Sequence, residues 1–318
     1  MRIAITGGTG FVGRHLARAL TNDGHEVVIV ARGKDRRDLD ARNLSGAGFM
    51  AISVADEYAL GVAFSACDAV AHCAGINREI GGATFQRVHV EGTRNVVKAA
   101  EQAGVKKIVL LSFLRARPGC ESAYHESKWE AEETVRASSL DYTVLKSGMI
   151  YGKGDHMLDH LTRSFHTIPL MATVGLRGKP VRPVAVEDVV RILKSALTER
   201  TLSRKTVAVV GPDEMSLSEV AGRVARVAGR RVIVFPMPVF FHYAMAWRLE
   251  RMMNIPLVTR AQVRILAEGV TEPLPLCEAL PESLLPTTHF TDDRIRRGLP
   301  VARAFGRRDC RWLAGADP

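Results

Sequence analysis

Three glycines near the N-terminus have a spacing that suits phosphate binding. Gly7, Gly10 and Gly13 lie in the segment TGGTGFVG, after the apolar run of residues 2–6 and before a helical pattern. Glycine allows a tight turn after a strand, a close approach of the backbone to a pyrophosphate, and close packing of the next helix. The free N–H groups at the start of that helix attract phosphate. We therefore predict a bound dinucleotide here, with a turn that holds no ligand as the alternative.

Basic residues after the second apolar run indicate which dinucleotide is bound. An acidic residue at this point would hold the ribose 2′-OH of NAD, whereas a cation accommodates the 2′-phosphate of NADP. This chain has VARGKDRR, with Arg32, Lys34, Arg36 and Arg37. The guanidinium of Arg32 can grip a phosphate through two hydrogen bonds, so NADP(H) is favoured over NAD(H). A merely solvated basic loop is the alternative.

A tyrosine and a lysine in the segment YHESK could move a proton. Tyr124 and Lys128 are four residues apart, so on a helix they share one face. A nearby ammonium stabilises the phenolate and brings the pKa of the phenol, ordinarily about 10, towards working pH. The pair therefore predicts a general acid or base.

The elements that must position these residues follow from the apolar pattern. Six short runs, rich in β-branched residues, predict buried parallel strands that alternate with amphipathic helices. This alternation predicts an α/β fold, a Rossmann doubly wound parallel sheet, with ligands outside the carboxyl ends of its strands. Two further strands and a helix capped by Ser216 are expected in a smaller C-terminal α/β region. The predicted strands are residues 2–6, 26–31, 49–54, 68–73, 107–112 and 142–147 in the sheet, and 205–211 and 231–235 in the smaller region.

Several segments together resemble a known family. TGGTGFVG, HCAG (72–75), VHVEGTRNVVKAA (88–100) and YHESK (124–128) resemble the short-chain dehydrogenase/reductase superfamily, in its extended and atypical branches. LKSGMIYGKGD (145–155) and RPVAVEDVV (182–190) are also similar to segments of the extended branch. The resemblance implies a Rossmann domain over residues 1–150, to which residues 184–200 return. It also implies a smaller substrate-binding region over residues 151–318, with a small-molecule substrate in the cleft between the two.

The resemblance also assigns roles to residues. Tyr124 is the expected catalytic acid or base, and Lys128 is expected to bind the nicotinamide ribose. The family usually has a Ser or Thr just beyond the fifth strand, but here Ser112 closes that strand and Leu114 stands where the hydroxyl belongs. Ser112 is therefore the first candidate for a third catalytic residue, with a local bond to the backbone as its alternative. Ser122, two residues before Tyr124, is a weaker candidate. The expected cofactor-binding residues are Gly7, Thr9, Gly10, Phe11, Val12, Gly13, Arg32, Ala74, Gly75, Tyr124 and Lys128.

Three functions are compatible with these residues. The first is an NADP(H)-dependent oxidoreductase that moves hydride between the cofactor and a carbonyl or alcohol, which the intact Tyr124 and Lys128 favour. The second is a non-catalytic NAD(P)H-binding structural or sensory protein, similar to the accessory subunit of respiratory complex I, which Leu114 favours. The third is a nucleotide-sugar epimerase or dehydratase of the NAD-dependent epimerase/dehydratase family, which fits less well with Arg32.

Composition narrows the remaining options. The 318 residues carry a net charge of +10, which attracts anions without selecting one. The five cysteines form no CxxC pair and suggest no disulfide framework, so a cytoplasmic protein is predicted. No metal site is expected. The arginine-rich residues 294–312 are expected to be a solvated tail or a surface helix, because no nucleic-acid-binding module accompanies them. Residues 235–256, rich in Met and aromatics, predict a core helix, with a substrate wall or a peripheral membrane or quinone-side contact as alternatives. The oligomeric state is left open.

Overall fold

The structure is a computed structural model that describes residues 1–33, 43–176, 178–253, 258–275, 277–301 and 304–305. The chain divides into two compact units. The first consists of Met1–Ser147, Val186–Val209 and Glu272–Pro286. The second consists of Gly148–Ala185, Val210–Thr271 and Thr287–Pro318.

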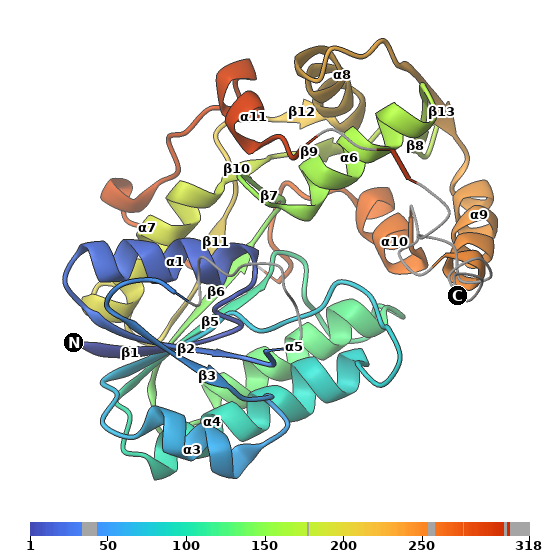
Figure 1. Ribbon diagram of the computed structural model, residues 1–318. Coiled ribbons are helices and arrows are strands. Elements are labelled where there is room, and N and C mark those ends of the chain that lie inside the picture. Colours follow the sequence, from blue (N-terminus) through green and yellow to red (C-terminus); the bar gives the residue numbers. More distant parts are fainter. Residues whose placement is uncertain (34–42, 177, 254–257, 276, 302–303, 306–318) are drawn as a thin grey trace, which may run out of the picture. The chain divides into compact units, whose positions relative to one another are not determined.

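The first unit is built on a seven-stranded parallel sheet (Figure 1), and its order is β11-β6-β5-β4-β1-β2-β3. The chain runs from β1 outwards to β3, then returns to the other side of β1 for β4, so the direction of winding reverses between β1 and β4. The predicted Rossmann fold is thus confirmed. The strands are β1 (Arg2–Thr6), β2 (Glu26–Ala31), β3 (Ala47–Ala51), β4 (Ala69–His72), β5 (Lys107–Phe113), β6 (Asp141–Ser147) and β11 (Lys205–Val209).

Helices cover both faces of this sheet. α1 (Phe11–Asn22) packs against α7 (Val186–Thr198) on one face, and α3 (Glu57–Phe64), α4 (Gly92–Gln102) and α5 (Ala123–Arg136) cover the other (Figure 1). A buried apolar core lies between the sheet and α3, α4 and α5, and includes side chains from all three helices. Burial on both faces explains why the strands read as nearly continuous apolar runs.

Two features of the first unit differ from the prediction. The third strand lies at Ala47–Ala51 and not at 49–54. The strand predicted at 205–211 as part of the smaller region is β11, which pairs in parallel with β6 from Lys205↔Thr143 to Val209↔Ser147. β11 thereby extends the parallel sheet by one strand and forms its edge. The apolar run itself does not encode which edge it will join.

The second unit consists of helices and three two-stranded sheets, which pair β7 with β10, β9 with β12, and β8 with β13. Its main core gathers around Tyr151, Leu158, Phe165 and Phe290. The cap predicted at Ser216 is confirmed as a capping box with Glu219. The elements are β7 (Ile150–Tyr151), α6 (His156–Thr167), β8 (Leu170–Val174), β9 (Pro180–Val181), β10 (Val184–Ala185), β12 (Met215–Ser216), α8 (Leu217–Val227), β13 (Ile233–Met237), α9 (Val239–Met252), α10 (Arg260–Glu268) and α11 (Asp292–Gly298).

Some sequence features stay outside this description. Lys34, Arg36 and Arg37 are not among the described residues, and neither are residues 302–303 and 306–312 of the arginine-rich segment. The start of that segment belongs to α11. Within the described residues, none of the helices has the length and apolar character needed to cross a bilayer. The cytoplasmic location stays a prediction.

Candidate functional site

The glycine-rich turn after β1 has the geometry that its sequence predicts. Gly7 adopts a positive φ of 70°, and its N–H donates to the Val30 carbonyl at 2.8 Å. A Cβ atom on Gly13 would lie 2.4 Å from the Gly7 carbonyl oxygen, and one on Gly7 would lie 2.7 Å from the Ala74 backbone nitrogen. A side chain at Gly13 would therefore push α1 away from the turn. A side chain at Gly7 would push the turn away from the end of β4.

The first turn of α1 is open to an anion. α1 begins at Phe11 after Gly10, and in this described segment no side chain caps the helix and its first turn carries no acidic residue. Thr9 and Phe11 are half-buried, whereas Val12 and Gly13 are buried. The orphan N–H groups of this turn carry the positive end of the helix dipole, so they suit the pyrophosphate of a dinucleotide.

Arg32 lies one residue beyond β2, at the same edge of the sheet as the glycine-rich turn. Its side chain is exposed, so its guanidinium is accessible to a phosphate group. Since Lys34, Arg36 and Arg37 lie outside the described residues, Arg32 is the part of the predicted basic segment that the structure places. The preference for NADP stays a prediction.

Lys128 reaches from α5 to the end of β4. Its side chain is buried, and its Nζ would lie 3.1 Å from a Cβ atom on Gly75. The ammonium also donates to the Leu111 carbonyl at 3.4 Å. Burial lowers the pKa of Lys128 to about 8, although the negative charge of Glu132 opposes this shift. The structure therefore brings the predicted residues Lys128 and Gly75 together. Gly75 directly follows Ala74, which lies against Gly7 of the glycine-rich turn.

Tyr124 lies one helical turn before Lys128, with its half-buried ring among other aromatic rings. Phe85, His89, Phe113 and His125 meet it edge-on, with centroids 5.4–5.8 Å away. Burial raises the pKa of the Tyr124 phenol well above its ordinary value. The expectation that Lys128 brings this pKa down finds no support in the free protein, because burial disfavours the phenolate.

His89 is a site residue that the sequence analysis did not identify. It lies in a π-helix, Gln86–Glu91, a rare conformation that is frequent at functional sites. The Ile76 N–H donates to His89 Nε2 at 3.1 Å, and Nδ1 lies 2.9 Å from Ser127 Oγ. Because Nε2 accepts, a neutral His89 carries its proton on Nδ1. Burial and the charge of Lys128 lower the pKa of His89 to about 2.

A second buried histidine joins the ends of β1 and β4. Thr93 Oγ1 donates to the His89 carbonyl at 2.5 Å, so it accepts from His72 Nε2 at 3.0 Å. His72 Nδ1 then accepts from the hydroxyl of Thr6 at 2.6 Å. Burial, with the charge of Lys128, lowers the pKa of His72 to about 3. One chain of hydrogen bonds thus fixes the glycine-rich turn relative to the π-helix.

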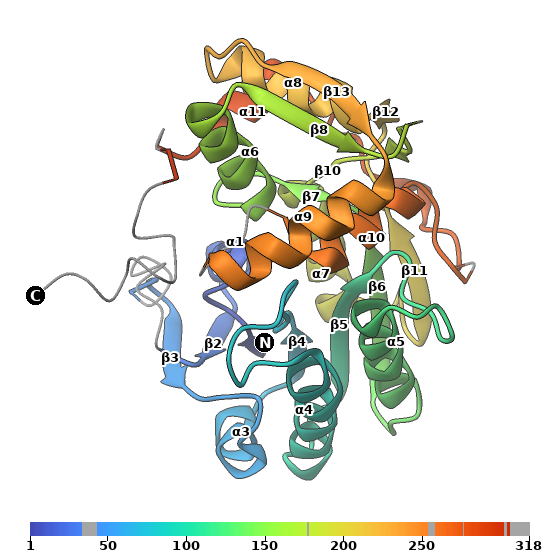
Figure 2. The same ribbon diagram turned by 90° about the vertical axis from the view of Figure 1, so that its right-hand side faces the viewer.

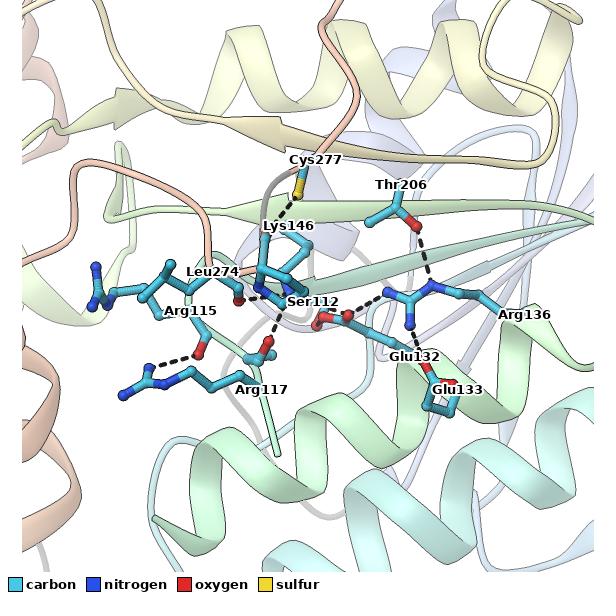
Figure 3. A network of polar contacts seen from close by, with 12 residues as sticks. Ser112, Arg115, Arg117, Glu132, Glu133, Arg136, Lys146, Thr206, Leu274 and Cys277 are labelled. Atoms are coloured by element: carbon cyan, nitrogen blue, oxygen red, sulfur yellow. Dashed lines mark hydrogen bonds and ion pairs between the residues drawn. The ribbon is translucent and has the colours of Figure 1, made fainter. Parts of the chain in front are cut away.

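The Ser112 hydroxyl has a different partner from the one predicted. It donates to Glu132 Oε1 at 2.5 Å, and Glu132 Oε2 pairs with Arg136 at 2.6 Å and with Lys146 at 3.3 Å (Figure 3). Glu132 and Lys146 are fully buried. The catalytic role predicted for Ser112 therefore has no support in this geometry. Leu114 is also fully buried, and its N–H donates to the Ser147 carbonyl at 2.9 Å.

A protein-family model described as NAD(P)H-binding matches residues 7–164, which include all the predicted cofactor-binding residues. The chain is 28% identical over 258 residues to an uncharacterized protein of Mycobacterium tuberculosis, an alignment that covers 81% of this chain but 27% of that protein. The chain thus spans about a quarter of the length of this relative. It is also 29% identical over 241 residues to the ceramide reductase of Caulobacter vibrioides, which covers 74% of this chain and 73% of that protein.

A subunit of complex I is related at a similar level. NADH dehydrogenase (ubiquinone) 1 alpha subcomplex subunit 9 of Mus musculus is 27% identical over 244 residues, or 75% of this chain and 64% of that protein. The solved structure of MoeE5 in complex with UDP-glucose and NAD has a TM-score of 0.69 at 19% identity, covering 94% of this chain and 97% of that chain. This likeness establishes the fold alone. The resemblance to extended and atypical short-chain dehydrogenases/reductases is confirmed.

The buried ion pair predicts a large effect on stability. Lys146→Met should lower the free energy of unfolding by about 3–5 kcal/mol, because it leaves the buried Glu132 carboxylate undercompensated. Adding Glu132→Leu should restore much of this loss. Urea denaturation measures both. Lys98→Met is the matched control: its Nζ lies 2.8 Å from Glu57 Oε1 at the surface, so its loss should cost less than about 1 kcal/mol. Equal effects of the two lysine substitutions would contradict the role of Glu132.

The neutral histidines predict a loss of stability in acid. The pKa values of His72 and His89 are about 3 and about 2 in the folded chain, against about 6.5 when unfolded. The unfolded state therefore binds more protons as pH falls below that value, which costs about 1.4 kcal/mol per histidine per pH unit. His89→Asn should reduce the slope of unfolding free energy against pH, measured by denaturation between neutral pH and pH of about 4. Identical slopes in variant and wild type would refute the assignment.

Proposed function

The chain belongs to the NAD(P)H-binding family over residues 7–164, and on this premise we propose that it is an NADP(H)-dependent oxidoreductase acting on a carbonyl or alcohol. The observation that carries the proposal is the position of the Lys128 ammonium over Gly75, one helical turn from Tyr124. Gly75 follows β4, so the Lys128 ammonium lies at the carboxyl end of that strand, which supports a cofactor-binding role for it. Ligands of doubly wound folds bind at this reversal of strand order.

The chain's own residues can hold each part of the cofactor. The turn Gly7–Gly13 and the first N–H groups of α1 suit the pyrophosphate, and the exposed guanidinium of Arg32 suits a 2′-phosphate. The Lys128 ammonium can donate to the ribose hydroxyls beside the nicotinamide. When bound, the nicotinamide would accept or donate the hydride. Negative charge brought in with the ligand would favour the ammonium form of Lys128, which burial disfavours.

Tyr124 is suited to donating a proton. The phenol is protonated at neutral pH, so it can transfer its proton to the carbonyl oxygen of a substrate that is being reduced. Burial raises its pKa and makes it a weaker acid, so the transfer needs a cation that stabilises the phenolate. Lys128, one helical turn away on α5, would stabilise the phenolate that remains. Phe85 and Phe113 pack around the ring and limit the access of water. The Caulobacter relative is named a ceramide reductase, which supports reduction as the direction of the reaction.

A second candidate is a protein that binds NAD(P)H without turnover. Leu114 takes the position of the family's hydroxyl donor, and Ser112 is bonded to Glu132. Removal of one such donor costs up to about 10³ in rate. The relationship to the complex I subunit also supports this candidate. The third candidate, a nucleotide-sugar epimerase or dehydratase, is supported by the fold of the MoeE5 complex and is less compatible with a cation at Arg32.

Charge reversal at Arg32 tests the choice of cofactor. Arg32→Glu should weaken NADPH binding at least about tenfold, or about 1.4 kcal/mol, and spare NADH, because only the 2′-phosphate loses its partner. Calorimetric titration with both cofactors measures this. Arg94→Glu, at an exposed position on α4, changes the net charge equally and should affect neither. Equal weakening of both cofactors by Arg32→Glu would reject the contact with the 2′-phosphate.

Removal of the phenol tests the chemistry. Tyr124→Phe should lower turnover by about 10²–10⁴ while leaving NADPH binding intact, because the ring remains and only the proton donor is lost. Oxidation of NADPH against aldehydes, ketones and quinones measures the rate. Tyr58→Phe, at a side chain 85% exposed on α3, is the control. Tight NADPH binding by wild type with no turnover on any of these substrates would favour the second candidate.

A further inference from the structure

Helix α9 of the second unit turns its large apolar side chains outwards. Phe240, Phe241, Met245, Trp247 and Met252 are all exposed, and Phe240 retains 65% of its accessible surface. A helix of a globular protein normally directs such residues into the core. At about 100° per residue these positions lie along one continuous side of the helix. This apolar side is therefore an unusual feature of the described surface.

The inner side of α9 shows that this orientation is fixed. His242 and Ala246 are the fully buried residues of the helix, and His242 Nε2 lies 3.3 Å from the Ala172 carbonyl oxygen of β8. Ala246 packs with Val174 and Val263 in a small core. α9 continues from β13 and lies beside α10 (Figure 2). A rotation that buried the phenylalanines would expose this core.

The charges on the outer side are all positive. Arg248 and Arg251 are its exposed charged residues, and the Arg251 guanidinium lies 3.7 Å from the centroid of the Trp247 ring. The acidic residue of the helix, Glu250, is half-buried and pairs with Arg260 at 2.8 Å. Phe, Trp and Met beside Arg on one helix face are typical of helices that lie in the interface of a bilayer.

We propose that α9 docks the protein onto the surface of an anionic membrane. Its aromatic side chains would enter the boundary between headgroups and acyl chains, while Arg248 and Arg251 contact anionic headgroups. The net charge of +10 acts in the same direction. Two copies of this face pressed together would bring arginines against arginines, so a lipid surface is the better match than a second copy. The proposal does not depend on cofactor binding, which residues of the first unit would carry.

Co-sedimentation of the whole 318-residue chain with vesicles tests the proposal. Wild type should bind vesicles of phosphatidylcholine with phosphatidylglycerol, and bind phosphatidylcholine alone at least about tenfold more weakly. The apolar variant Phe240→Ser/Phe241→Ser/Trp247→Ser should lose binding. The charge variant Arg248→Glu/Arg251→Glu should weaken binding to the anionic vesicles at least about tenfold. The matched control is Tyr58→Ser/Val62→Ser, which removes two exposed apolar side chains of α3 and should bind like wild type.

Three results would overturn the proposal. The first is a wild type that stays in the supernatant with anionic vesicles. The second is equal binding by wild type and the charge variant, which contains only surface substitutions and should fold. The third is a dimer in light scattering that the apolar variant makes monomeric, because the face would then belong to a second copy. A blue shift of tryptophan emission on adding anionic vesicles, lost in Trp247→Phe, would support insertion of α9. Unchanged NADPH affinity in each variant separates this test from that of the proposed function.

Discussion

The carboxylate of Glu132 is fully buried, and its charge has to be matched inside the first unit. Ser112 of β5, Lys146 of β6 and Arg136 of α5 supply the partners. Glu132 follows Lys128 by one helical turn and Tyr124 by two, so the network that anchors it also sets the position of both site residues relative to the sheet. The Lys146 ammonium also donates to the carbonyls of Ala116 and Leu274. The second of these bonds connects the segment Glu272–Pro286 to the network around Glu132 (Figure 3). Such a network contributes to a defined geometry more than to net stability.

The electrostatics of the site follow from burial. Lys128, His72 and His89 lie close to one another, and burial disfavours the charged form of all three. The two histidines stay neutral and act through hydrogen bonds, which orient the glycine-rich turn, the end of β4 and the π-helix. Lys128 is thus the cation of this cluster, and it gains most from a ligand that brings negative charge. A phosphate-bearing cofactor is such a ligand. The preference of Lys128 for negative charge would be the same whether or not the protein catalyses a reaction.

The two proposals rest on different units of the chain. Cofactor binding depends on backbone approach at Gly7 and Gly13 and on the charge of Lys128, all in the first unit. Membrane docking depends on the outward side of α9 in the second unit. A chain that holds a nicotinamide cofactor and a lipid-facing helix would meet apolar substrates or partners at a bilayer. The cofactor-binding proposal and the membrane-docking proposal can each be wrong while the other is right.

The sequence by itself determined the features that depend on local pattern. The six strands follow from short apolar runs rich in β-branched residues. The shared helix face of Tyr124 and Lys128 follows from the period of 3.6 residues, and the glycine-rich turn from conformations that glycine readily adopts. Tertiary structure decided what depends on distant neighbours. Only the fold gives β11 its place beside β6, directs Ser112 to Glu132, and turns His89 to Ile76 and Ser127. The pKa of Tyr124 rises for the same reason: desolvation is set by side chains brought together from β5, α5 and the π-helix, and no local spacing encodes it.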